Sequence, residues 1–157
     1  MRIFGAPVID PQGKRPPNRS PNPSPGRLSP VTVEVICHND FAAYNMVFRD
    51  HELVGIIDWD FAGPGPRLWD LAYLAYRMVP LMGPENPDAP NRTIDLGRRM
   101  KRLLDAYGTD ASVITLLTVV IERLEDLASF THSHAAARQD EALLRDARGY
   151  SADAAYL

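Results

Sequence analysis

The chain has 157 residues, 45% of them hydrophobic, which predicts one domain with a packed core and excludes two full domains. Its formal net charge is −3 and its 17 Lys and Arg residues are scattered, so the basic surface typical of nucleic-acid binders is not expected. A single cysteine excludes an intrachain disulfide, and no apolar run is long enough for a membrane span or a secretory signal, so we expect a cytoplasmic protein without a membrane partner.

Residues 11–30 are rich in proline and contain almost nothing that could be buried. Such a segment cannot offset the entropy lost on ordering by burying apolar surface. We therefore expect residues 1–30 to form a disordered linker and residues 31–157 to form the folded domain.

The next residues favour strands. Residues 31–37 alternate and are β-branched, and residues 44–49 and 53–57 predict two further short strands. Asp50, His51 and Glu52 lie between the last two strands, which predicts a hairpin. The segment 61–67 is rich in glycine and proline and is expected to be a loop.

The remainder of the chain favours helices. Apolar residues at helical spacing predict helices over about 68–81, from the low nineties to 107, over 111–131 and over 139–147. Asn91 or Thr93 is the expected cap of the second helix, Gly108 its end, and Asp110 the cap of the third. The pattern leaves 151–157 unassigned.

The most informative motif is H-N-D-F-A-A-Y-N, residues 38–45, followed by I-D-W-D at residues 57–60. It matches the kinase catalytic-loop pattern H-x-D-x-x-x-x-N, and Asp58 follows Asn45 by thirteen positions. In this chemistry one aspartate orients or accepts a hydroxyl proton. An asparagine and a second aspartate bind the Mg²⁺ ions that bridge nucleotide phosphates.

Three motifs together, H-N-D-F-A-A-Y-N, G-I-I-D-W-D-F-A-G-P-G-P and R-L-W-D-L-A-Y, resemble the aminoglycoside phosphotransferase and choline kinase-like family of small-molecule kinases. The resemblance covers about residues 31–155. It implies an α+β, protein-kinase-like fold: a mainly helical C-terminal lobe with a short β-hairpin carrying the catalytic loop. The implied cofactors are Mg²⁺ and ATP or another nucleoside triphosphate.

The resemblance also implies roles for individual residues. Asp40 would be the catalytic aspartate, with His38 and Asp70 supporting the catalytic loop. Asn45 and Asp58 would be the metal ligands.

Two sets of acidic residues have more than one interpretation. Asp60 could assist a second metal or cap the following loop, and the second role is favoured. Glu122, Glu125 and Asp126 could face a cationic acceptor, although a solvated helix face is the favoured interpretation. The roughly twelve residues between Asp58 and Asp70 leave no room for an activation segment, which favours a small hydroxylated acceptor over a protein.

The resemblance does not extend to the family's N-terminal lobe, which carries a phosphate-covering loop and a strand lysine. Residues 1–30 would hold at most a remnant of it, and neither Lys14 nor Lys101 lies in a V-A-I-K-like strand. We therefore expect a truncated phosphotransferase with weak or no activity alone, which self-associates or needs a complementing lobe. The alternative is a non-catalytic remnant that serves as a binding module.

Overall fold

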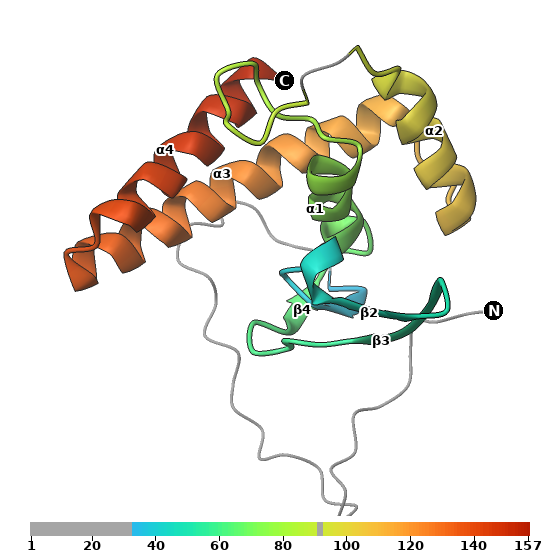
Figure 1. Ribbon diagram of the computed structural model, residues 1–157, viewed down its shortest axis with the longest axis horizontal. Helices are drawn as coiled ribbons and strands as arrows, with labels where there is room; N and C mark the ends of the chain where they lie inside the picture. The colour runs from blue at the N-terminus through green and yellow to red at the C-terminus, as the bar shows by residue number, and fades with distance from the viewer. Residues whose placement is uncertain (1–32, 91–92) are drawn as a thin grey trace, which may run out of the picture.

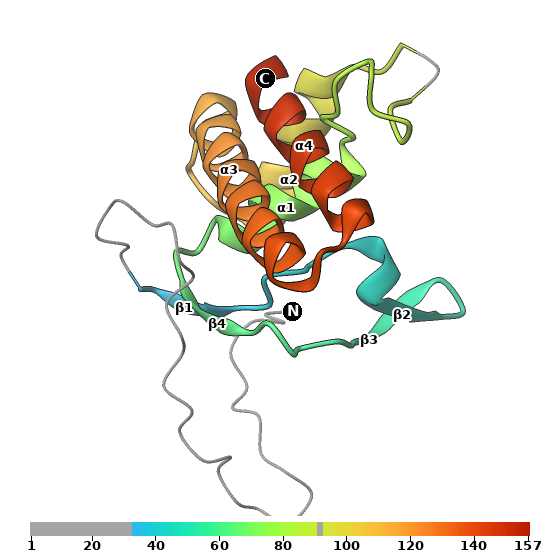
Figure 2. The same cartoon turned by 90° about the vertical axis from the view of Figure 1, so that its left-hand side faces the viewer.

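The computed structural model describes residues 33–90 and 93–157. The predicted linker and the candidate cap Asn91 lie outside these ranges. Four helices lie over two small β-sheets, as Figures 1 and 2 show. This mixture of helices and strands is compatible with the α+β class expected from the sequence.

The strands form two antiparallel pairs, β1 with β4 and β2 with β3. Their bounds are Val35–Cys37 (β1), Met46–Arg49 (β2), Glu52–Ile56 (β3) and Gly63–Gly65 (β4). The expectation that 61–67 is only a loop was wrong, because β4 pairs with β1 and places Gly65 opposite Val35. A Cβ atom on Gly65 would lie 2.8 Å from Cys37 Sγ, so glycine allows the two strands to approach.

The β2–β3 hairpin turns at Asp50 and His51, whose φ angles are 50° and 67°. Positive φ at both central residues is the geometry of a type I′ turn, whose twist matches that of the flanking strands. The hairpin places the end of β3 beside the start of β2, where Met46 is opposite Ile56.

The helices begin and end at residues that differ from several of the expected ones. Their bounds are Trp69–Met78 (α1), Leu96–Tyr107 (α2), Val113–Arg138 (α3) and Glu141–Tyr156 (α4). The expected caps Thr93 and Asp110 were wrong: Asp95 caps α2 by accepting from Arg98 N, and Ser112 caps α3 by accepting from Thr115 N. Gly108 ends α2 in the left-handed conformation, as expected.

The core lies where α1 packs against α3, with α4 running alongside α3 (Figure 1). Apolar side chains from α1 and α3 fill it, including Leu71, Ala72, Ala75, Leu116, Val120 and Leu124. None of the helices in the described ranges is long and apolar enough to cross a bilayer. Packing against α3 supports α1, whose first turn faces the strands and the loop between them.

Helix α4 extends well beyond the expected end at Ala147, and a buried carboxylate explains why. Asp153 accepts hydrogen bonds from the Tyr76 hydroxyl (2.7 Å), Gly83 N (2.8 Å) and Asn86 Nδ2 (2.6 Å). Burial, and then the bond to Asp153, raise the pKa of Tyr76 far above its ordinary value. These bonds join the last turns of α4 to α1 and to the segment that follows it.

Candidate active site

The loop between β1 and β2 is held by a carboxylate from helix α1. Asp70, in the first turn of α1, accepts from His38 N at 2.7 Å and from Asn39 N at 2.9 Å. Hydrogen bonds from backbone N–H groups to a charged acceptor are stronger than neutral ones. The structure therefore brings Asp70 to the loop that it was expected to support.

His38 is buried and joins the loop to the end of β3. Its Nε2 lies 2.8 Å from the carbonyl oxygen of Ile57, and its Nδ1 accepts from Asp40 N at 3.2 Å. Because Nδ1 accepts, Nε2 carries the proton and donates to Ile57. The imidazole thus links the backbone of Asp40 to the residue before Asp58.

Asn39 adopts a left-handed conformation, with φ at 66°, and bonds in three directions. Its main-chain N–H donates to Asp70, and its side-chain Nδ2 donates to Phe61 O at 2.8 Å. Its main-chain carbonyl accepts from Arg123. Asparagine tolerates positive φ better than most residues. These bonds hold the turn that presents Asp40.

Both carboxylate oxygens of Asp40 accept a hydrogen bond. Asn45 Nδ2 donates to Oδ2 and also to the main-chain carbonyl of Asp40, each at 2.9 Å, and the Tyr44 hydroxyl donates to Oδ1. Because the Asn45 amide nitrogen is directed at Asp40, its amide oxygen is the atom that could bind a cation. The structure thus brings two of the expected site residues into direct contact.

The remaining acids follow β3. Ile57 N donates to Asn45 O at 3.0 Å. Asp58 is the residue directly after Ile57. Asp58 is exposed and has φ at 63°, in the left-handed region that aspartate adopts more readily than most non-glycine residues. Asp60 is also exposed and lies in a turn closed by Ala62 N and Trp59 O.

Among the residues that the structure describes, no group of three His, Cys, Asp or Glu side chains forms a metal site. The expected ligand set includes an amide, however, and its chemistry fits Mg²⁺, which prefers carboxylate and carbonyl oxygens and retains several waters. The candidate donors are Asn45 Oδ1, whose amide nitrogen binds Asp40, and the exposed carboxylate of Asp58.

A pocket of about 310 Å³ opens beside Asp40. Helices α3 and α4 contribute Asp126, Phe130 and Tyr150 to its lining, and α1 contributes Tyr73. Of the three acids considered for an acceptor, only Asp126 lines this pocket. It accepts from Arg123 NH1 at 3.2 Å, so one positive charge offsets it.

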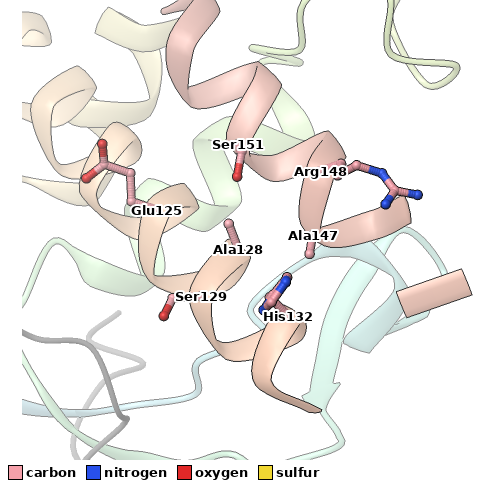
Figure 3. Close-up of a pocket in the computed structure, with 7 residues that line it drawn as sticks. All are labelled: Glu125, Ala128, Ser129, His132, Ala147, Arg148 and Ser151. Atoms are coloured by element: carbon pink, nitrogen blue, oxygen red, sulfur yellow. The ribbon is translucent and has the colours of Figure 1, made fainter. Parts of the chain in front are cut away.

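Glu125 lines a different pocket, of about 450 Å³, between α3 and α4 (Figure 3). Ala128 and Ala147 form its floor, and His132 and Arg148 lie at its sides. Glu122 is exposed. The solvated-face interpretation therefore describes Glu122, while Asp126 lies at the candidate site.

Sequence reasoning missed Arg123, which is 4% exposed. Its guanidinium donates to Asn39 O and lies over the rings of Trp69 (5.2 Å) and Tyr73 (5.6 Å). Burial lowers its pKa from the ordinary arginine value. The sequence offered only a weak signal, a single arginine between Glu122 and the apolar Leu124 on this helix.

The loop between β1 and β2 and the acids that follow it lie in a part of the chain that resembles a known family. Residues 27–96 match the model of the phosphotransferase enzyme family, which confirms the resemblance expected from the motifs. The match includes all four strands, the loop and helix α1. Neither a curated protein nor a solved structure matches the chain.

Proposed function

We propose that this chain is the helical lobe of a small-molecule O-phosphotransferase with a protein-kinase-like fold, dependent on ATP and Mg²⁺. The observation that carries the proposal is Asp40, held at the mouth of a pocket by bonds to both of its carboxylate oxygens. The family match supports the reaction class.

In this reaction the Asp40 carboxylate accepts the proton of an acceptor hydroxyl, whose oxygen attacks the terminal phosphorus of ATP. The bond from that phosphorus to ADP then breaks, and the phosphoryl group stays on the acceptor. Asn45 and Asp58 would hold Mg²⁺, which when bound neutralises charge on the phosphate oxygens. His38 and Asp70 keep the loop in place throughout.

The pocket beside Asp40 suits a small hydroxylated acceptor. Phe61, Phe130 and Tyr73 give it aromatic walls, and Asp126 gives it a carboxylate. Aromatic faces also accommodate a cation, so cationic acceptors belong to the proposed class. A panel of aminoglycosides, choline, homoserine and sugars samples this chemistry.

The test is transfer of radiolabelled phosphate from Mg–ATP to this panel by the purified chain. Asp40→Asn should lower the rate of transfer by a factor of about 10² to 10⁴, because the proton acceptor is lost. Asp105→Asn is the matched control, since Asp105 pairs with Lys101 on the exposed side of α2. Unchanged turnover in Asp40→Asn would refute the assignment.

The alternative is a binding module without catalysis. It is favoured by the position of Lys101, which lies on helix α2 and pairs with Asp105 in place of a phosphate. Titration of Mg–ATP into the wild-type chain and into Asp58→Asn separates the two functions. In a kinase lobe, Asp58→Asn should lower the affinity for the nucleotide. A binding module should show no nucleotide binding that depends on this residue.

A further inference from the structure

We propose that Tyr44, Tyr73 and Tyr150 form a chain of hydroxyl groups that positions the Asp40 carboxylate for proton transfer. This inference rests on the proposed function. It adds three positioning residues that the catalytic-loop motif does not contain, from three different parts of the chain.

The series of hydroxyl groups begins at Tyr44 in the exposed loop. Tyr44, in the short 3₁₀ helix Ala43–Asn45, donates to Asp40 Oδ1, and its oxygen lies 3.0 Å from the Tyr73 hydroxyl. Since the single hydroxyl hydrogen of Tyr44 is directed at Asp40, Tyr73 is the donor in the second bond. The order of donors therefore points from helix α1 toward the carboxylate.

The series of hydroxyl groups continues into helices α1 and α4. Tyr73 is buried on α1, and Tyr150 on α4 interacts with it closely enough to affect its pKa. All three residues line the pocket beside Asp40. The hydroxyl of Tyr73 on a rigid helix thus fixes Tyr44, a residue that is 55% exposed.

The two donors on Asp40 act at different oxygens. Asn45 binds Oδ2 and Tyr44 binds Oδ1, so rotation about either side-chain bond of Asp40 breaks at least one hydrogen bond. Each carboxylate oxygen keeps a lone pair for the acceptor hydroxyl. Precise placement of the base matters, because a displacement of about 1 Å can lower a rate about a hundredfold.

The hydroxyl groups remain donors at neutral pH. Burial raises the pKa of Tyr73 and of Tyr150. A phenolate could not donate to Asp40, so the network retains its order across the physiological range.

The geometry allows one rival role. The Tyr44 hydroxyl could occupy the place of the acceptor hydroxyl and have to be displaced before transfer. In that case its removal would speed the reaction or lower the KM for the acceptor, whereas removal of a positioning group lowers kcat.

The experiment compares Tyr44→Phe, Tyr73→Phe and the double variant with the wild-type chain, using Mg–ATP and the best acceptor of the panel. We expect Tyr44→Phe to lower kcat about tenfold, with the KM for ATP unchanged within about twofold. The double variant should be no slower than Tyr44→Phe, because Tyr73 acts through Tyr44. Tyr107→Phe, which loses one bond to Arg67 O, is the matched control.

The outcomes separate the two proposals. An active wild type with unchanged or faster turnover in Tyr44→Phe would overturn the positioning role and leave the proposed function standing. A rise in the KM for ATP at constant kcat would also overturn it. A wild-type chain that transfers no phosphate to any acceptor, and whose binding of Mg–ATP does not depend on Asp58, would refute the proposed function, and the positioning role with it.

Discussion

At the scale of single residues, Asp70 has the largest influence on the candidate site without lining its pocket. Its single carboxylate accepts hydrogen bonds from the main-chain N–H groups of both His38 and Asn39. It lies in the first turn of α1, where a negative charge also interacts favourably with the helix dipole. The shape of the loop is therefore tied to the position of a helix.

Asp70→Asn should lower both stability and turnover, because an amide offers one acceptor oxygen to two donors. We expect the free energy of unfolding to fall by about 1–3 kcal/mol, measured by urea denaturation, and kcat to fall more than the KM for ATP changes.

Asp95→Asn provides the control for this substitution. Asp95 caps α2 through one bond to Arg98 N, and asparagine caps helices about as well as aspartate. An Asp70→Asn protein as stable and active as this control would show that the two loop bonds contribute little.

Residue identity predicted some of the site and not the rest. The motif H-x-D-x-x-x-x-N located Asp40 and Asn45, because its spacing reflects contacts within one loop, such as the bonds from Asn45 to Asp40. Arg123 binds the same loop from 84 positions away. No local pattern encodes such a contact, which depends on how α3 packs.

At the scale of elements, the hairpin shows where local chemistry and structure disagree. Asp50 and His51 both have positive φ, and type I′ turns favour asparagine or aspartate followed by glycine. Histidine at the second position is strained relative to glycine. The turn was nevertheless predictable, since Asp50 is a favoured residue and strands flank it on both sides.

His51→Gly should stabilise the hairpin by about 0.5–1 kcal/mol, because glycine adopts positive φ without steric cost. Amide hydrogen exchange across β2 and β3 is the suitable measurement, since it reports on this element separately. Arg49→Gly places the same residue within β2 and should weaken the pairing. Faster exchange in both variants would contradict the turn geometry.

The ends of the helices were predicted less well than their existence. Asp110 and Ser112 are both good caps two residues apart, and only the bond from Thr115 N to the Ser112 side chain distinguishes them. Helix α4 continues through Gly149 to Tyr156, since Asp153 is bound to α1 and to Gly83. Tertiary contacts extend this helix beyond its local sequence signal.

At the scale of the whole molecule, the apolar side chains left at the surface are concentrated on the strands and the segments joining them. They include Val33, Ile36, Val47, Phe48, Val54, Ile57, Trp59 and Phe61, each more than a third exposed. Together with sheet edges that no strand among the described residues covers, such a surface favours association. Self-association through the strand layer therefore stays a prediction.

Light scattering should detect species larger than a monomer whose proportion rises with protein concentration. Phe48→Lys should shift this equilibrium toward the monomer, because a charge on β2 opposes pairing between edges. Ile114→Lys changes an even more exposed apolar residue on α3 and should have little effect. A wild-type monomer at high concentration would count against the expectation.

The bond between Arg123 and Asn39 has a further consequence for the order of events during synthesis. A ribosome produces the loop first and α3 some eighty residues later, so the nascent loop lacks this bond until α3 has emerged. A protein arrested before α3 would carry the motif without it.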